Sequence, residues 1–241
     1  MPIQVTNIGG FIVNNFVLET SAGIIVIDTG YPGSVGRFLS RFQSKWPLSD
    51  LKAIVLTHHH DDHAGFLGEL LEHCDAQVIL HPLALPWLAA GSNSQPPGAG
   101  YTSRPAALIG RLRRTVSYPP VQLGNRAILV RDGQDQVFEQ RGLPIRLITL
   151  PGHTADSIGL FLPESKLLFC GDAAMNAPIS AARHAIWIED QADYGRSWDK
   201  MLALRPARVY PSHGLPFHPR DLARYRHFLD NRPLIPPNKS R

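Results

Sequence analysis

Six consecutive residues, His58-His59-His60-Asp61-Asp62-His63, limit most strongly what this chain can fold into. The apolar run 53–56 before them is typical of a buried strand, and the periodic run 64–71 after them is typical of a helix. The six residues are therefore expected on a loop that joins a strand to a helix. Imidazole and carboxylate groups bind zinc and similar divalent metals. We therefore predict that this loop binds metal.

The spacing within the loop divides the candidate ligands into two pairs. Alternate side chains of an extended segment share a face, so His58 and His60 can hold one ion while His59 points elsewhere. Where the chain turns into the helix, the adjacent Asp62 and His63 can turn towards a second ion. Each pair is incomplete, because a zinc centre commonly takes about three protein ligands and a water. Further ligands are expected downstream.

Three such candidates each follow an apolar run. His153 lies in Pro-Gly-His-Thr at 151–154, Asp172 in Cys-Gly-Asp at 170–172, and His213 in Pro-Ser-His-Gly at 211–214. Folds of helices and strands gather their chemistry at the ends of strands. We expect the three to meet the 58–63 loop at one edge of a sheet structure.

Together these motifs resemble those of the metallo-β-lactamase-fold hydrolases. His-x-His-x-Asp-His at 58–63, Pro-Gly-His-Thr, Gly-Asp at 171–172 and Ser-His-Gly at 212–214 look like the family's metal-ligand motifs. Ile-Asp-Thr-Gly at 27–30 resembles its first motif, whose aspartate supports the metal loop. Five separated motifs agree in order, so the resemblance covers nearly the whole chain. It implies an α+β fold, a four-layer αββα sandwich with two sheets face to face and helices outside.

The resemblance also implies two divalent metal ions, for which we predict zinc, with iron and manganese as alternatives. Three ligands belong to each ion and one is shared. The predicted ligands are His58, His60 and His153 for the first ion, Asp62, His63 and His213 for the second, and Asp172 for both.

The predicted chemistry follows from the metals. Two zinc-like ions about 3.5–4 Å apart can share a bridging water and lower its pKa towards neutrality. The hydroxide can attack an electrophilic carbon, while Asp62 or Asp172 beside it carries its proton to the leaving group. We therefore predict metal-dependent hydrolysis of an ester, thioester or lactone in a small-molecule substrate, with Asp62 and Asp172 as catalytic residues.

Departures from known subfamilies narrow this prediction. The lactamases of the fold lack the bridging aspartate, so Asp172 argues against a true β-lactamase. Enzymes that resemble glyoxalase II carry a C-terminal helical domain, for which the residues after Gly214 are too few. Lactonases of the fold have a tyrosine where this chain has Met175. Two alternatives stay open, an iron-dependent oxidoreductase similar to persulfide dioxygenases and a nucleic-acid phosphodiesterase.

Composition supports an ordinary globular protein: 241 residues, 44% hydrophobic and 18% charged, with a net charge of +4. Two cysteines are too few for a disulfide framework, and Cys170 is expected to be a small buried side chain. No apolar run approaches the ~20 residues of a membrane span, and no secretory signal is recognised. We expect a cytoplasmic protein without membrane contact. The short basic run 111–114 stands alone, so nucleic acid is not an expected partner.

We expect one domain over residues 1–231, interrupted by a Gly- and Pro-rich insertion at about 87–120. Long irregular connections are commonly functional, so we expect the insertion to form a lid, with Trp87, Tyr101 and Leu108 in apolar contact. The alternative is a mobile loop without substrate contact. Residues 232–241 are expected to form a loose Pro-rich tail.

The segment after Asp172 is expected to line the substrate pocket. His184 in this segment is expected to be a surface imidazole, and the alternative is that it hydrogen-bonds a substrate oxygen or acts as an acid. Asn14 and Asn15 are expected to face the site, with a bulge or edge position as the alternative. The expected strands are 3–8, 11–19, 24–27, 53–56, 77–80, 127–130, 136–139, 145–150, 157–162, 166–169 and 208–210. The expected helices are 32–46, 64–71, 105–115, 193–204 and 220–229.

Overall fold

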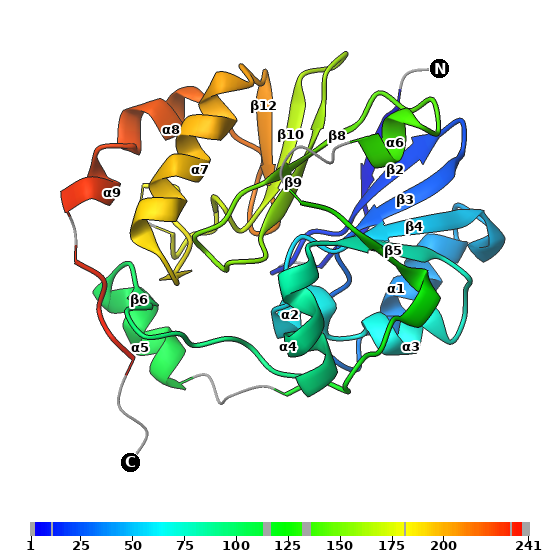
Figure 1. Ribbon diagram of the computed structural model, residues 1–241, viewed down its shortest axis with the longest axis horizontal. Coiled ribbons are helices and arrows are strands. Elements are labelled where there is room, and N and C mark those ends of the chain that lie inside the picture. Colours follow the sequence, from blue (N-terminus) through cyan, green and yellow to red (C-terminus); the bar gives the residue numbers. More distant parts are fainter. Residues whose placement is uncertain are drawn as a thin grey trace.

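The computed structural model describes residues 3–10, 12–112, 117–131, 136–180, 182–231 and 233–237. Two main sheets pack face to face in the middle of the molecule (Figure 1). The first has the order β1 (Gln4–Asn7), β2 (Phe16–Thr20), β3 (Gly23–Ile27), β4 (Leu51–Val55), β5 (Gln77–Leu80), β7 (Ala127–Leu129). The second has the order β12 (Arg208–Pro211), β10 (Leu167–Gly171), β9 (Ile158–Leu162), β8 (Arg146–Thr149).

Strand direction explains where the helices lie. β3, β4, β5 and β7 run parallel to one another, and so do β10 and β12. Parallel neighbours need crossover connections, which are usually helical. α1 (Val35–Gln43) joins β3 to β4, α3 (Leu67–Leu71) precedes β5, and α7 (Gln191–Ala203) precedes β12. These helices cover the outer faces of the two sheets (Figure 1).

Three apolar clusters separate the four layers. Ile25 and Ile27 of β3 pack between the sheets, whereas Ile24 and Val26 pack on the opposite face beneath α1 and α3. This period of two is what a strand buried on both faces requires. A third cluster lies between the second sheet and α7, which contributes Trp198 among others. The structure is thus the predicted αββα sandwich of the α+β class.

One predicted strand is wrong. Residues 136–139 form the helix α6 (Gln136–Glu139). The adjacent Val137 and Phe138 both pack against the cluster between the sheets. Neighbouring side chains of a strand point to opposite faces, so a strand could not place both there. A short apolar run does not distinguish the two structures by itself.

Two predicted helices are each divided into two. The run 64–71 becomes α2 (Asp61–Ala64) and α3, so Asp62 and His63 lie in a helical turn. The run 220–229 becomes α8 (Arg220–Tyr225) and α9 (Phe228–Asn231). The predicted helix 105–115 is α5 (Arg104–Leu112), and its last residues lie outside the described part. The other helical segments are α4 (Leu85–Ala90), η1 (Leu48–Asp50), η2 (Pro82–Ala84) and η3 (Gly124–Arg126).

The insertion and the C-terminal segment meet in a small third sheet. β6 (Gly100–Tyr101) pairs with β11 (Trp187–Ile188), and Tyr101 also exchanges two backbone hydrogen bonds of 2.8 Å with Ile235. In Figure 1 the C-terminal segment passes beside β6 and α5. The expectation of a loose tail is therefore wrong at Ile235, which backbone pairing holds, and residues 232 and 238–241 lie outside the described part.

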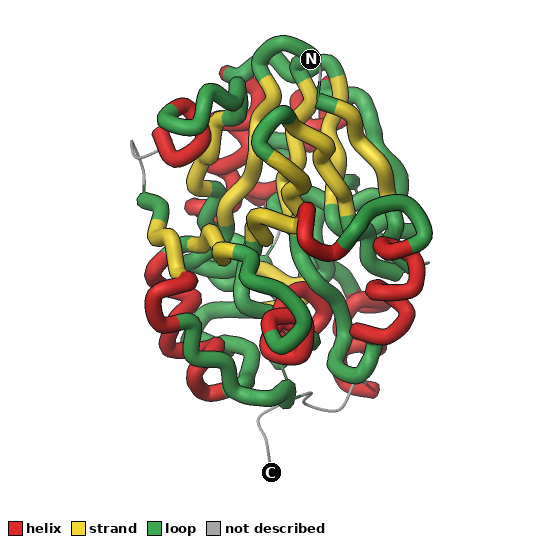
Figure 2. The backbone as a smooth tube through the Cα atoms, turned by 90° about the vertical axis from the view of Figure 1, so that its right-hand side faces the viewer, coloured by secondary structure: helices red, strands yellow, loops and turns green. Residues whose placement is uncertain are grey.

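Figure 2 shows the strands of the sheets side by side in the upper half of the view, with long loops gathered below them. Among the described segments, no helix has both the length and the apolar character that a bilayer crossing requires. Cys170 is buried on β10, as predicted.

Candidate metal centre

The seven predicted ligands gather where strands of both sheets end. They follow β4, β8, β10 and β12, and all seven side chains are buried. Potential ligand atoms within 4.8 Å of one another form three groups, His58, His60 and His153; His58, His63 and Asp172; Asp62, His63 and His213. We call the first of these the first group and the last the second group. The structure therefore brings together every residue of the predicted ligand set.

The first group has the spacing that a tetrahedral ion requires. His153 Nε2 lies 3.2 Å from His58 Nε2 and 3.1 Å from His60 Nδ1. Nitrogen ligands about 2.0–2.1 Å from a tetrahedral zinc ion are about 3.3–3.4 Å apart. Three imidazoles with this spacing fit a borderline divalent metal.

Asp172 lies between the two groups. Its Oδ2 is 3.4 Å from His213 Nε2 and 3.7 Å from His153 Nε2, and its Oδ1 is 3.8 Å from His63 Nε2. In the second group, Asp62 Oδ2 is 3.3 Å from His213 Nε2. One carboxylate thus faces both groups, which is the position that a shared ligand requires.

Buried polar atoms provide a test of whether a metal fits. His63 Nε2 and Asp172 Oδ1 are buried and make no hydrogen bond among the described residues. Burying such atoms without a partner costs free energy, and native proteins generally satisfy them. A divalent ion in the second group would satisfy both atoms, so the residues present fit a metal.

Asp28, in the first motif, holds the metal-binding loops together. Its carboxylate accepts hydrogen bonds from Thr57 N at 2.7 Å, Thr57 Oγ1 at 2.8 Å and Ser212 Oγ at 3.0 Å, and it lies 2.9 Å from His63 Nδ1. These partners lie on the loops that follow β4 and β12 and in α2. These contacts therefore agree with the supporting role that the family resemblance implies for Asp28.

Hydrogen bonds at Nδ1 orient most of the histidines. A ring that donates from Nδ1 keeps the Nε2 lone pair free for a metal. The Nδ1 contacts are His63 with Asp28 Oδ2, His153 with Trp187 O at 2.8 Å, His213 with Ile12 O at 2.8 Å, and His58 with Thr57 Oγ1 at 3.0 Å.

The electrostatics differ between the groups. Burial, together with neighbouring histidines, lowers the pKa of His58 and His60 well below the ordinary value, so both stay neutral with their lone pairs available. Burial also acts to lower the pKa of His63, but the carboxylates of Asp62, Asp28 and Asp172 outweigh it and raise the pKa to about 10. The second group thus has a strongly negative environment that favours a cation.

A glycine lets the chain turn into His153. Gly152 has φ +130°, and a Cβ there would lie 2.3 Å from the backbone N and Cα of Tyr194. The Gly152 carbonyl also accepts hydrogen bonds from Glu189 N and Asp190 N, at 2.8 and 3.0 Å. Only a residue without a side chain allows this close approach of α7.

Two residues near the cluster, Tyr31 and Asp156, were not predicted, whereas Asn14 was among the residues expected to face the site. Tyr31, on the loop after β3, places its hydroxyl 3.4 Å from Asp62 Oδ2. Asp156 lies 2.8 Å from the ring of His59, which explains why His59 is not among the ligands. Asn14 donates to Pro211 O and Gly214 O on either side of His213. Asp156 had a local signal, three residues after His153, whereas Tyr31 meets the site only through tertiary folding.

The first residue of the insertion contacts the metal-binding loop. Trp87 stacks on the ring of His59, with centroids 5.4 Å apart and planes at 19°. The rings of Tyr101 and Trp187 pack edge to face. The backbone carbonyl of Trp187 in turn contacts Nδ1 of His153. Leu108, on α5, is 59% exposed. Trp87 and Tyr101 thus contact residues of the site, and the lid function itself stays a prediction.

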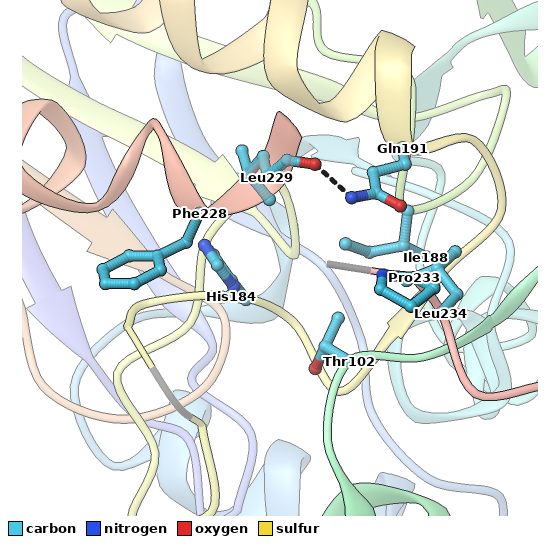
Figure 3. Close-up of a pocket in the computed structure, with 8 residues that line it drawn as sticks. All are labelled: Thr102, His184, Ile188, Gln191, Phe228, Leu229, Pro233 and Leu234. Carbon is cyan, nitrogen blue, oxygen red and sulfur yellow. Dashed lines mark hydrogen bonds between the residues drawn. The ribbon is translucent and has the colours of Figure 1, made fainter. Parts of the chain in front are cut away.

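His184 is buried, so the expectation of a surface imidazole is wrong. It packs on Trp198 of α7, with ring centroids 5.2 Å apart. It also lines a cavity about large enough for one water molecule, together with Thr102, Phe228 and Leu234 (Figure 3). None of the seven predicted ligands lines this cavity. His184 therefore belongs to the packing between the insertion, α7 and the C-terminal segment.

Comparisons with known proteins agree with this geometry. A relative from Bacillus subtilis (strain 168), named "Probable metallo-hydrolase YflN", is 27% identical over 206 residues, covering 80% of this chain and 75% of the relative. "Thioesterase pkgB" from Emericella nidulans is 26% identical over 88% of this chain, which spans about half of that relative (49%).

The structural comparison includes a solved metalloprotein. A crystal structure described as TTHA1623 in a di-iron-bound form is 26% identical, with a TM-score of 0.64. The match covers 93% of this chain and 99% of that one. The family model described as the metallo-beta-lactamase superfamily matches residues 8–213. This chain belongs to the metallo-β-lactamase superfamily.

Proposed function

We propose that this protein is a metal-dependent hydrolase that holds two divalent ions and cleaves an ester, thioester or lactone bond in a small molecule. The observation that carries the proposal is the convergence of seven buried imidazole and carboxylate groups from four strand ends. The nitrogen spacing in the first group supports zinc, and the di-iron form of TTHA1623 keeps iron as an alternative.

In this proposal the ligands divide as their spacing suggests. Bound divalent ions supply Lewis-acid polarisation of a carbonyl and activation of water. The ligands are His58, His60 and His153 in the first group, Asp62, His63 and His213 in the second, and Asp172 between them.

The chain's own residues then handle protons and orient the substrate. The carboxylates of Asp62 and Asp172 face the cluster, where they accept a proton from the attacking water and return it to the leaving group. The hydroxyl of Tyr31 donates to Asp62 Oδ2 at 3.4 Å in the free protein, and by rotating it would donate instead to a substrate oxygen beside the second group. Burial of the cluster strengthens each of these interactions.

The test combines metal analysis with a substrate panel. Protein purified without chelators is assayed for metal per chain and for hydrolysis of lactones, oxygen esters, thioesters, a phosphodiester and a chromogenic β-lactam. Because one relative is named a thioesterase, thioesters are the first substrates to test. The variants are His60→Ala and Asp172→Ala, and the control is His73→Ala at an exposed position outside the motifs.

We expect about two ions per chain and hydrolysis that both site variants lose and the control keeps. Hydrolysis that survives complete metal removal would overturn the proposal. An iron-dependent oxidoreductase is the second candidate, because a similar structure was solved with two irons. Iron loading combined with oxygen consumption, and no hydrolysis across the panel, would select that alternative.

A further inference from the structure

The two members of the 58–63 motif that are not in the predicted ligand set both face the insertion. His59 and Asp61 are buried, and each contacts the start of the segment 91–103. We infer that His59 is a positioning residue: it closes a ring of hydrogen bonds that couples closure of the 91–103 segment to metal binding in the first group. This inference rests on the metal sites of the proposed function.

The first half of the ring joins the two loops that carry the first group. His59 lies between His58 and His60, and Asp156 lies three residues after His153. Asp156 accepts His59 N at 2.9 Å, and its second oxygen lies 2.8 Å from His59 Nδ1. A buried pair of this kind fixes the separation of the two loops, and with it the separation of the three imidazoles that they present.

The second half of the ring brings in the insertion. Ser94 N donates to His59 Nε2 at 3.0 Å, so both ring nitrogens of His59 are engaged. The Ser94 hydroxyl donates to Glu189, whose other oxygen accepts Ala155 N at 3.1 Å. Ala155 precedes Asp156, which closes the ring. Glu189 also lies two residues after Trp187, whose carbonyl orients His153.

Contacts beside the ring fasten the same segment from its other side. Asn93 Oδ1 accepts Asp61 N at 2.9 Å, and Asn93 Nδ2 donates to Asp61 Oδ1 at 2.6 Å. Tyr118, at the far end of the insertion, donates its hydroxyl to the carbonyl of His59 at 2.6 Å. Trp87 covers the His59 ring. The motif is thus bonded to the insertion through His59 and Asp61, its two residues outside the predicted ligand set.

This arrangement predicts coupling in both directions. A metal in the first group holds His58, His60 and His153 at fixed positions, and so holds the His59–Asp156 pair on which Ser94 is seated. By thermodynamic reciprocity, closure of the segment strengthens metal binding by the same factor by which metal binding favours closure, so loosening Ser94 weakens metal binding. Changes in groups that orient metal ligands typically cost 10–100-fold in metal affinity. We expect about tenfold, the lower end, because the ring acts on loops rather than on ligand atoms.

The experiment measures zinc affinity and segment protection in the same proteins. Ser94→Ala removes the hydroxyl that bonds Glu189 and leaves the motif residues unchanged. His59→Asn retains an N–H donor towards Asp156 and removes the acceptor for Ser94 N. The matched controls are Ser49→Ala and His73→Asn, both at exposed positions. Zn²⁺ is titrated into metal-free protein against a chromophoric chelator, and hydrogen exchange of residues 92–103 is followed by mass spectrometry with and without Zn²⁺.

We expect Zn²⁺ to slow exchange of residues 92–103 in the wild type and controls, and to slow it less in both site variants. Both variants should bind the zinc ion of the first group about tenfold more weakly, while urea unfolding of the metal-free controls stays unchanged. If Ser94→Ala binds the zinc ion of the first group as tightly as the wild type does, the coupling is overturned and the proposed function stays intact. A wild type that binds neither Zn²⁺ nor Fe²⁺ would overturn both.

Discussion

Replacing Asp28 by asparagine tests how the metal-binding loops are held. The carboxylate is fully buried and has four neighbours that carry an N–H or O–H group: Thr57 N, Thr57 Oγ1, Ser212 Oγ and His63 Nδ1. An asparagine has one oxygen and one NH₂ group in the same space. Whichever way the amide is turned, an N–H group faces another donor.

The expected fall in the free energy of unfolding follows from counting these contacts. With the amide oxygen towards Thr57 N, the NH₂ group meets His63 Nδ1 and two hydroxyls. In this orientation the hydroxyls can rotate, but at least two hydrogen bonds to a charged group are lost. Each is worth about 1.5–3 kcal/mol, so we expect the free energy of unfolding to fall by about 3 kcal/mol at the lower end. His63 would also be forced to carry its proton on Nε2, the nitrogen that faces the second group.

Urea unfolding of the metal-free protein measures the loss of stability, and zinc titration measures the second effect. We expect binding of the second ion to weaken by about 10–100-fold, the range typical for groups that orient metal ligands. Asp50→Asn, at an exposed position, is the control. An Asp28→Asn protein that binds two ions as tightly as the wild type would refute the argument that Asp28 sets the His63 tautomer.

Three further predictions concern other parts of the site. The metal-free protein should be most stable near pH 6.5 in urea unfolding between pH 5 and 9. Two histidines of the first group have a lowered pKa, so they remove stability as the pH falls below about 6.5. The pKa of His63 is raised to about 10, so its contribution is lost as the pH rises from 6.5 towards 10. Tyr31→Phe should lower turnover about tenfold in steady-state assays and leave metal content unchanged; unaltered turnover would remove Tyr31 from the mechanism. Gly152→Ala should lower the free energy of unfolding by about 3 kcal/mol or more, because its Cβ would meet the backbone of α7 at a positive φ. The control is Gly36→Ala, where a Cβ meets nothing within 4 Å.

The positions of the seven ligand candidates could be predicted because each signal is local. An apolar run marks the end of a strand, and the polar motif follows within a few residues, as at His153 and Asp172. The order of layers was implied by the family resemblance, and the alternation in β3 agrees with it. The roles of the seven residues as ligands stay predictions until metal is measured.

The remainder could not be read from local patterns. Ser94 and Glu189 have polar side chains in irregular segments, and only tertiary folding brings them to His59 and Ala155. His184 looked like a surface residue because its neighbours along the chain are polar and small, yet α7 and the insertion bury it. The helix at 136–139 was missed because four residues carry no usable period.

Because the ligands come from both sheets, the metal site affects when the protein can bind metal during folding and how long it stays folded. The three imidazoles of the first group become neighbours only after chain segments more than ninety residues apart have docked. Closing loops of that length is slow and comes late in folding, so the metal cannot template the early steps. The complete metal site therefore exists only in the fully folded sandwich. Once loaded, an ion would link one sheet to the other, and its departure should precede or accompany their separation, making metal release a determinant of the protein's lifetime.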